Sequence, residues 1–211
     1  MFTQVYRQKL WAASGDVHDG YYSGPGSHDR EVVNDYLACI EKFSKDNPSF
    51  KSAVDLGCGD FNIGKSIAPL FDEYVAVDIV DEVIEYNRKI FNFENVVFEC
   101  INAIEEDLPD TDVVFVREVL QHLKNDEILK IISNIRQSSR CLVVTESLPG
   151  MPHEFIHNLE RGIGPNTRFS LGSGVVLQSS PFDLAFQSTE CLNITIRGDS
   201  LLKTDVYFFE K

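Results

Sequence analysis

The sequence has few of the features that mark secreted, membrane-spanning or metal-stapled proteins. No apolar run approaches the ~18 residues that a membrane-spanning helix needs. The first ten residues also lack the apolar stretch of a signal peptide. The five cysteines are widely spaced, odd in number and form no Cys-x-x-Cys pair. These absences predict a cytoplasmic protein with reduced thiols, without a disulfide framework or a cysteine-bound zinc ion.

Positive charge is also scarce. The chain has 19 Lys and Arg against 33 Asp and Glu, which gives a formal net charge of −14. An acidic surface repels phosphate backbones, and the nearest approach to a basic cluster is the short segment 136–140. We therefore expect a small-molecule partner and no binding to nucleic acid or membrane. The oligomeric state stays open.

What the sequence does contain is a regular alternation of strand and helix patterns. Short apolar, β-branched runs typical of buried parallel strands lie at residues 53–56, 74–77, 96–98, 112–116 and 141–145. Helical patterns lie near residues 28–43, 81–91 and 125–138. The alternation predicts an α/β fold with a doubly wound, mostly parallel sheet of seven strands and helices on both faces. Residues 192–196 and 205–209 predict a closing pair of strands that can be antiparallel.

Two irregular regions interrupt this alternation within a chain whose length suits a single domain, 1–211. Residues 11–27 are rich in Gly, Tyr, Ser and Asp, and they belong to an expected N-terminal helical cap, 1–45. Residues 149–181 carry many glycines and prolines. Loops of this length are usually lids or binding loops, so we expect the second region to be a substrate loop.

Aromatic and histidine residues in these regions are candidates for contact with substrate. Tyr21 and Tyr22 predict a lid that closes over a ligand, and plain core packing is the alternative. His153 and His157 form a His-Glu-x-x-His pattern, which would place both rings on one face if Pro152 began a helix. No third metal ligand is identifiable downstream, so we expect no metal. A substrate role and a solvated pair both remain open.

The most informative stretch is the glycine turn that follows the first expected strand. Gly57-x-Gly59 resembles a dinucleotide fingerprint that lacks its third glycine, while residues 59–66 spell the P-loop expression G-x-x-x-x-G-K-[ST]. A nucleoside loop is the third possibility. Asp55 and Asp60 would repel phosphate by about 1 to 4 kcal/mol at about 4 Å, so the charges favour a cationic ligand. Asp78, which ends the next strand, suits the two hydroxyls of a ribose.

Three segments together resemble successive motifs of the class I methyltransferases that use S-adenosylmethionine. They are residues 54–60, 77–80 and 114–123. The flanks are similar to a small bacterial subgroup with a Ser-Gly-x-Gly-Ser segment, here residues 23–27, and a late Pro-Phe element at 181–182. The subgroup's Trp-Arg pair is replaced here by two valines, Val175 and Val176. The resemblance implies S-adenosylmethionine as cofactor and a small-molecule acceptor, with oxygen favoured and a sugar or surface-polysaccharide precursor as the implied class.

Carried over residue by residue, the resemblance implies a set of cofactor contacts. They are Asp55, Gly57, Cys58, Gly59, Asp78, Ile79, Asn102, Ala103, Ile104 and Arg117. If the acceptor is a hydroxyl, a base must take its proton, and His122 and Glu118 are the candidates. The alternatives are a structural histidine and a cofactor-touching glutamate. A P-loop nucleotide hydrolase and a non-catalytic cofactor-binding module remain as alternative functions.

Overall fold

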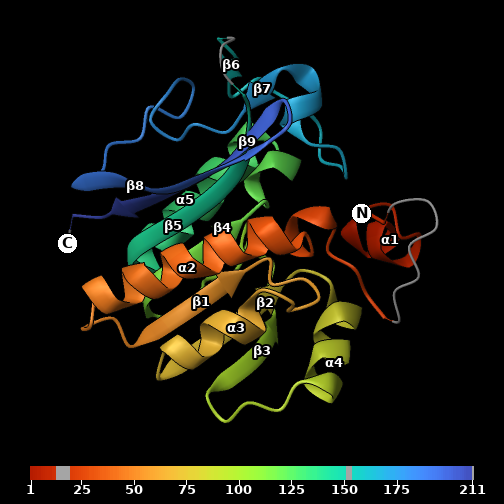
Figure 1. Ribbon diagram of the computed structural model, residues 1–211, viewed down its shortest axis with the longest axis vertical. Coiled ribbons are helices and arrows are strands. Elements are labelled where there is room, and N and C mark those ends of the chain that lie inside the picture. Colours follow the sequence, from red (N-terminus) through yellow and green to blue (C-terminus); the bar gives the residue numbers. More distant parts are fainter. Residues whose placement is uncertain (13–19, 151–153, 211) are drawn as a thin grey trace. The chain divides into compact units, whose positions relative to one another are not determined.

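The computed structural model describes residues 1–12, 20–150 and 154–210, which form two compact units, Met1–Asn102 and Ala103–Lys211. The strands follow the order β3-β2-β1-β4-β5-β9-β8, and Figure 1 shows the course of the chain. This order contains seven strands and confirms the predicted doubly wound, mostly parallel sheet. Whether the chain is one functional domain stays a prediction.

The first unit contains three parallel strands whose predicted positions are confirmed. They are β1 (Ser52–Leu56), β2 (Glu73–Asp78) and β3 (Val96–Cys100). In register, Leu56 lies opposite Val77, and Asp78 lies opposite Cys100. Since parallel strands end at the same edge of a sheet, the glycine turn after β1 and Asp78 at the end of β2 are brought together.

Six helical segments accompany these strands. They are α1 (Phe2–Arg7), η1 (Pro25–Ser27), α2 (Arg30–Asp46), α3 (Gly64–Ile67), η2 (Ala68–Leu70) and α4 (Asp81–Ile90). Helix α4 packs on β2 and β3 (Figure 1), with acids in its first turn and bases in its last. Helix α2 begins later than predicted because the carboxylate of Asp29 accepts the N–H groups of Glu31 and Val32 as an N-cap.

Phe61 fixes the conformation of the loop between β1 and α3. Its φ is +59°, unusual for a residue with a side chain, and its ring is fully buried. Ring centroids of Phe98, Phe91, Phe93 and Tyr74 lie 4.8, 5.1, 6.0 and 6.2 Å away. The loop is therefore filled by its own aromatic side chain.

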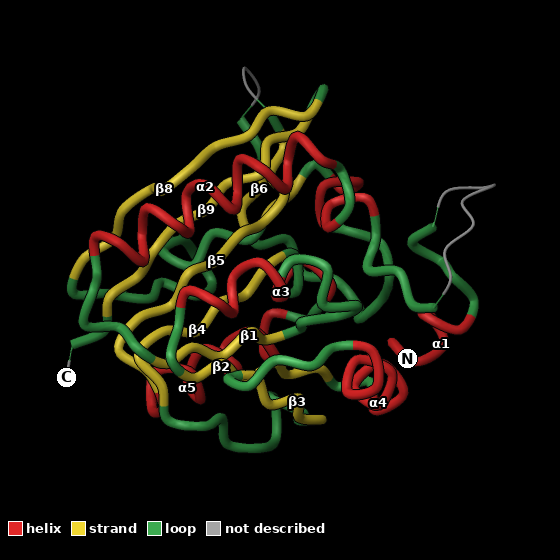
Figure 2. Tube along the Cα trace, turned by 60° about the horizontal axis from the view of Figure 1, so that its bottom comes forward, coloured by secondary structure: helices red, strands yellow, loops and turns green. Residues whose placement is uncertain are grey.

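The second unit begins with two parallel strands and ends with an antiparallel pair. Strand β4 (Thr111–Arg117) pairs with β5 (Ser139–Pro149), which pairs with β9 (Ser200–Phe208), and β9 pairs with β8 (Ser188–Arg197). Figure 2 shows β5, β9 and β8 running side by side. The antiparallel closing pair is thus confirmed.

Helical structure in the second unit follows β4. A short turn, η3 (Leu120–His122), leads into α5 (Asn125–Ser138), whose two ends agree with the prediction. The isoleucines of α5 give the helix one apolar stripe, and Ile128, Ile132 and Ile135 are buried. The turn η3 thus stands between a strand and a well-anchored helix.

The described part of the region 149–181 is largely irregular, as predicted, but His157 is not on a helix. Strands β6 (Ile156–His157) and β7 (Ser173–Gly174) pair in parallel, and η4 (Arg168–Leu171) lies between them. His157 therefore lies in a strand, so the helical His-Glu-x-x-His interpretation is wrong. His153 lies outside the described residues. Within the described part, no group of three His, Cys, Asp or Glu residues could hold a metal ion.

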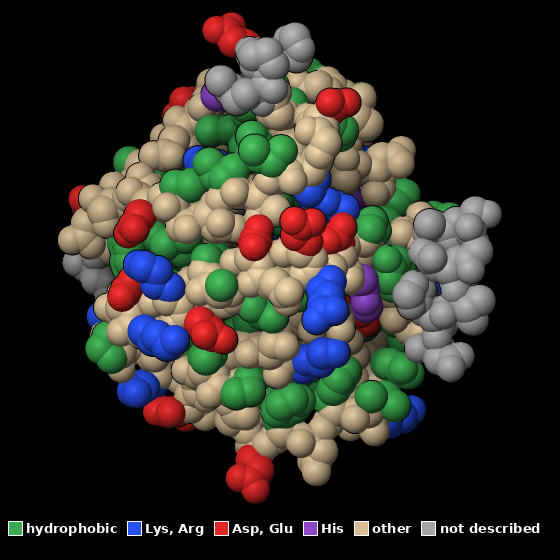
Figure 3. All heavy atoms as spheres, in the orientation of Figure 1, with side chains coloured by type: hydrophobic (Ala, Val, Ile, Leu, Met, Phe, Trp, Pro, Cys, Tyr) green, Lys and Arg blue, Asp and Glu red, His purple; other side chains and the backbone are tan. Residues whose placement is uncertain are grey.

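The face of the protein shown in Figure 3 has a mixed charge pattern and not a basic one. On the face that Figure 3 shows, Lys and Arg side chains are interspersed with Asp and Glu, and no continuous basic patch appears in the described part. Among the described helices, none has the length and apolar content needed to cross a membrane.

Phe61→Ala should lower the free energy of unfolding by about 3 to 5 kcal/mol, because a fully buried ring is replaced by a cavity. Urea denaturation followed by circular dichroism measures the loss. Phe91→Ala is the matched control, since this ring of the same cluster is only half-buried and should cost less. Equal losses in the two variants would contradict the role given to Phe61.

Candidate functional site

The backbone N–H groups of the glycine turn are all engaged within the protein. Those of Gly57 and Cys58 donate to the carbonyl oxygen of Val77, at 2.8 and 2.9 Å. The next four donate as follows: Gly59 to Asp78 Oδ2, Asp60 to Ser23 Oγ, Phe61 to the carbonyl of Cys58, and Asn62 to Asp60 Oδ1. Six consecutive amides are therefore directed inward.

This hydrogen-bond pattern distinguishes between the kinds of ligand that the sequence left open. A phosphate cradle needs several N–H groups that point at the ligand, and residues 57–62 offer none. Lys65, the lysine of the P-loop expression, donates instead to Asn62 Oδ1 at 2.7 Å. The turn is suited to a ligand with donors of its own, such as an ammonium group and hydroxyls, and not to a triphosphate.

Asp78 is the acid that the fold places at this turn. Its two carboxylate oxygens accept the N–H groups of Gly59 at 3.0 Å and Val80 at 2.9 Å, which fixes its orientation. Burial raises the pKa of Asp78 to about 6, although the backbone hydrogen bonds oppose the rise. A ligand that donates hydroxyls to this carboxylate would favour its ionised form.

Apolar and polar residues expected around an adenine ring lie near the ends of β2 and β3. Ile79 follows Asp78 and is 45% exposed, which is high for a large apolar side chain beside a buried acid. Asn102 and Ile104 are half-buried, while Ala103 is buried and its carbonyl accepts from Asn134 Nδ2 at 2.8 Å. Cys58 is buried too, and burial raises the pKa of its thiol well above the usual value.

The two acids that the charge argument emphasised have structural partners. Asp60 Oδ2 is 2.9 Å from the N–H of Ser23 and 2.7 Å from Nε2 of His28. Asp55 Oδ2 lies close to Gly64, where an added Cβ would approach it to 2.8 Å. Asp60 therefore pins the N-terminal segment to the loop. The expected role of Asp78 at the ribose stays a prediction.

An aromatic cluster covers the glycine turn. Tyr6 OH lies 3.3 Å from Ser23 Oγ, and a Cβ on Gly59 would come within 2.9 Å of that hydroxyl. Gly59 also has a φ of +52°, so both its space and its conformation require glycine. The ring of Tyr6 meets Trp11 edge-on at 5.1 Å. The composition of residues 11–27 indicated this region, whereas no sequence signal singled out Tyr6.

The two tyrosines predicted for the lid have different surroundings. Tyr21 meets Tyr6 edge-on, with ring centroids 5.8 Å apart, and its hydroxyl donates to Glu82 at 3.4 Å. Arg7 pairs with the same carboxylate. Tyr22 instead stacks on His28 at 4.4 Å. Tyr21 therefore belongs to the aromatic cluster over the glycine turn. Tyr22 packs on His28, which contacts the turn at Asp60.

In the second unit, a strained residue follows β4. Glu118 has a φ of +55°, and its N–H donates to the carbonyl of Thr145 at 2.7 Å. One carboxylate oxygen lies 3.3 Å from Nη1 of Arg117, and the other accepts from Ser147 Oγ at 3.1 Å. The glutamate is therefore held from both sides at the carboxyl end of the strand.

His122 has a defined tautomer. Its Nδ1 lies 3.1 Å from the carbonyl oxygen of Gly164 and 3.3 Å from that of Asn166. Because carbonyl oxygens only accept, Nδ1 must carry a proton, and in the neutral ring Nε2 is then the proton acceptor. Burial lowers the pKa of His122, which keeps the ring neutral at pH 7.

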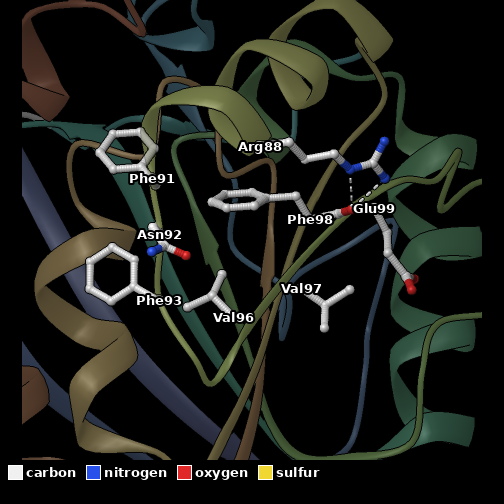
Figure 4. A pocket seen from close by; sticks show the side chains of 8 residues that line it. All are labelled: Arg88, Phe91, Asn92, Phe93, Val96, Val97, Phe98 and Glu99. Atoms are coloured by element: carbon white, nitrogen blue, oxygen red, sulfur yellow. Dashed lines mark hydrogen bonds between the residues drawn. The ribbon is translucent and has the colours of Figure 1, made fainter.

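The remaining predicted residue of the late loop lies apart from this arrangement. His157 is exposed, and its Nδ1 lies 2.8 Å from Ser179 Oγ. Neither it nor any other predicted site residue lines the hollow in Figure 4, where Arg88 donates to the carbonyl of Phe98 at 3.1 Å. That hollow lies at the end of α4 and along β3.

Residues 54–141 match the family model described as "Methyltransferase domain". The fold of the whole chain is similar to that of several solved structures. One is the N-methyltransferase NodS from Bradyrhizobium japonicum WM9 in complex with S-adenosyl-l-homocysteine. It has a TM-score of 0.64 and 12% identity, with 98% of this chain and 99% of that chain covered.

Two further structures have the same fold. The N-terminal domain of EvdMO1 with S-adenosylhomocysteine bound has a TM-score of 0.61 and 13% identity, covering 99% of this chain and 96% of that one. Human N-acetylserotonin methyltransferase in complex with S-adenosylmethionine has a TM-score of 0.61 and 14% identity, covering 100% of this chain and 59% of that one. No curated protein matches the sequence significantly.

Asp60→Ala should release the N-terminal segment from the glycine turn. The amides of Ser23 and Asn62 both lose their acceptor, so we expect their hydrogen exchange to accelerate at least tenfold, a change of about 1.4 kcal/mol in opening free energy. Exchange measured by NMR at these two amides tests this. Asp72→Ala, an exposed acid, is the control. Unchanged exchange in Asp60→Ala would show that other contacts hold the segment.

Proposed function

We propose that this chain, whose residues 54–141 match the methyltransferase model, is a class I methyltransferase that uses S-adenosylmethionine and methylates a hydroxyl oxygen of a small molecule. The observation that carries the choice of oxygen is the tautomer of His122. Its Nδ1 proton is held by two loop carbonyls, so the opposite nitrogen accepts a proton. A neutral amine is nucleophilic enough to accept a methyl group without a base. A hydroxyl is a weaker nucleophile and needs a base to take its proton during the transfer.

In this proposal the first unit holds most of the cofactor. The backbone of Gly57, Cys58 and Gly59 lies against the methionine part of the cofactor, and the Asp78 carboxylate receives the ribose hydroxyls. Ile79 lies against the adenine. Asp55 supports the turn from below rather than touching the ligand, which departs from its predicted role as a direct contact. What supports this assignment is the inward direction of the turn's N–H groups.

The remaining proposed contacts are carried over from the resemblance to the family. In this proposal Asn102, Ala103 and Ile104 flank the adenine ring. Arg117 stands beside the methionine part. S-Adenosylmethionine supplies an electrophilic methyl group when bound, and the protein's own task is to align the acceptor and exclude water.

The N-terminal cluster acts as a lid in the proposed enzyme. Tyr6 and Tyr21 lie over the turn, and the latch to Glu82 is made by Arg7 and Tyr21. The contacts to Glu82 lie at the surface, whereas Tyr6 packs with the buried Val80 and Val83, so opening for ligand exchange separates this packing.

His122 would remove the proton of the acceptor hydroxyl through Nε2 as the oxygen–carbon bond forms and the bond between the methyl carbon and the sulfonium sulfur breaks. Glu118, held by Arg117 and Ser147, stabilises the resulting imidazolium electrostatically, in keeping with its effect of raising the pKa of His122. In this proposal Glu118 acts electrostatically, and His122 is the base.

A sugar is the proposed class of acceptor. EvdMO1, one of the proteins with the same fold, has also been crystallised in the presence of S-adenosylhomocysteine and D-fucose. NodS is an N-methyltransferase, so the fold by itself accommodates either acceptor atom. The late loop 149–181, with His157 and the undescribed His153, is the proposed site of the acceptor. A cytoplasmic location and the absence of nucleic-acid partners remain predictions from composition.

Cofactor affinity should fall as the pH drops through about 6. The ionised Asp78 carboxylate accepts the ribose hydroxyls, and with a pKa of about 6 it is mostly protonated at pH 5.5. We expect the Kd of S-adenosylhomocysteine, measured by calorimetry, to rise about fourfold between pH 7.5 and 5.5. The raised pKa favours the protonated form in the unliganded fold, so affinity is lost rather than structure.

Asp78→Asn is the matched control for this titration. The variant should bind weakly at both pH values and should lose the pH dependence, because the amide has no proton to gain. Stabilisation of the wild-type protein by ATP with Mg²⁺, but not by S-adenosylhomocysteine, would contradict the proposed function outright.

His122→Gln should lower kcat by about 10² to 10⁴ while leaving the Kd of S-adenosylhomocysteine unchanged, since it removes only the base. The assay follows S-adenosylhomocysteine release with free sugars, nucleotide-activated sugars and matched amino sugars as acceptors. Glu190→Gln, at an exposed site on β8, is the control and should keep its kcat. Transfer to amines alone, or an undiminished rate in His122→Gln, would exclude the hydroxyl mechanism.

A further inference from the structure

We propose that Glu146 and Arg168 are positioning residues for methyl transfer. Their side chains hold the two ends of the turn 120–123, which carries His122, by hydrogen bonds to its backbone, and thereby fix the ring as the Nδ1–H tautomer. This inference rests on the proposed role of His122 as the base. It adds two residues that no motif of the sequence had indicated.

Glu146 holds the amino end of the turn. It lies near the end of β5 and is 3% exposed. Its Oε1 accepts the N–H of Leu120 at 2.8 Å, and its Oε2 accepts the N–H of Gln121 at 3.2 Å. These are the first amides of η3, so one carboxylate caps the whole start of the turn.

Arg168 holds the carboxyl end of the turn. It is fully buried, and one guanidinium nitrogen donates to the carbonyl of Leu123 at 2.7 Å. Another donates to the carbonyl of Leu159, within the late loop. The same side chain therefore ties the end of the turn to the loop that contains Gly164 and Asn166.

The two charges match the polarity of the turn that lies between them. N–H groups at the start of a helical turn carry partial positive charge, and carbonyl groups at its end carry partial negative charge. The carboxylate stands at the first and the guanidinium at the second. His122 lies between these anchor points, and the N–H of Gly164 returns to the His122 carbonyl at 3.2 Å. Ring and loop are thus held in one arrangement.

The charged form of each buried group depends on its partners. Burial and Glu118 raise the pKa of Glu146 to about 8, although the N–H groups of Leu120 and Gln121 and the Arg168 guanidinium oppose the rise, so the carboxylate form depends on these partners. Burial lowers the pKa of Arg168, and Glu160 and Glu146 raise it. Removing Arg168 alone would favour the protonated acid, and removing Glu146 alone would leave Arg168 with Glu160 as its acidic neighbour. A buried charge that loses a partner usually costs more stability than removal of the pair.

The design has a mechanistic consequence. The carbonyls that hold Nδ1–H belong to the late loop, so His122 is set as a base only when that loop is docked. Arg168 docks it at Leu159, and Arg161 joins Asn166 to Gln121 of the turn. Docking of the proposed substrate loop and fixing of the His122 tautomer therefore occur together. A plain apolar contact would dock the loop without fixing the orientation of its carbonyl groups.

Nitrogen-15 NMR of the full-length protein's histidines tests the clamp without any acceptor. The His122 ring is assigned by its loss in His122→Gln. In the wild type we expect the neutral Nδ1–H tautomer and a pKa below the ordinary value of about 6.5. In Glu146→Gln we expect the tautomer ratio to move at least threefold toward Nε2–H and the pKa to move back toward 6.5. Glu190→Gln, at an exposed site on β8, should match the wild type.

The double variant Glu146→Gln with Arg168→Met separates positioning from stability. It removes both buried charges, so its Tm should recover relative to either single variant, while the altered tautomer ratio of His122 should persist. A double variant, or a folded Glu146→Gln, that keeps the wild-type tautomer and pKa would overturn the clamp. Should Glu146→Gln fail to fold, the double variant alone decides.

The clamp and the proposed base are tested independently. An undiminished rate in His122→Gln would reject the base while leaving the tautomer result intact. A wild-type tautomer in the clamp variants would reject Glu146 and Arg168 as positioning residues without affecting the kinetic test of His122.

Discussion

The carbonyl oxygen of Val77 accepts the N–H groups of both Gly57 and Cys58, and Asp78 accepts that of Gly59. These bonds attach the turn after β1 to the end of β2. They turn the amides inward, and the positive φ values of Gly57 and Gly59 permit that course. This direction of the N–H groups decides which ligand the first unit's site favours. A turn whose N–H groups are all engaged within the protein favours a ligand that has hydrogen-bond donors.

In the second unit, the corresponding constraint is the orientation of the proposed base, His122. A neutral imidazole can hold its proton on either nitrogen, and only an acceptor fixed beside one nitrogen makes the choice. Here the acceptors are carbonyls of an irregular loop, which has no regular structure of its own to orient them. Buried polar and charged side chains therefore orient these carbonyl groups. Elsewhere in the chain, the backbone hydrogen bonds of strands and helices orient them.

Much of the fold could be predicted from local patterns. The strands that end at Leu56 and Asp78 and the helix 125–138 were identified because buried parallel strands and amphipathic helices leave periodic apolar signals. The prediction was less accurate where a cap decides the boundary, as at Asp29. It was wrong at His157, because a two-residue strand in a loop leaves no periodic signal.

The sequence by itself determined the fold class, the glycine turn and the acid at the end of the next strand, since these depend on residue type and spacing along short segments. It could not assign Asp60, whose nearby charge pointed to the cofactor but whose partners are Ser23 and His28. Nor could it indicate Tyr6, Glu146 or Arg168. Their neighbours lie 17, 26 and 45 positions away in the chain, so only the tertiary structure decides which groups they meet.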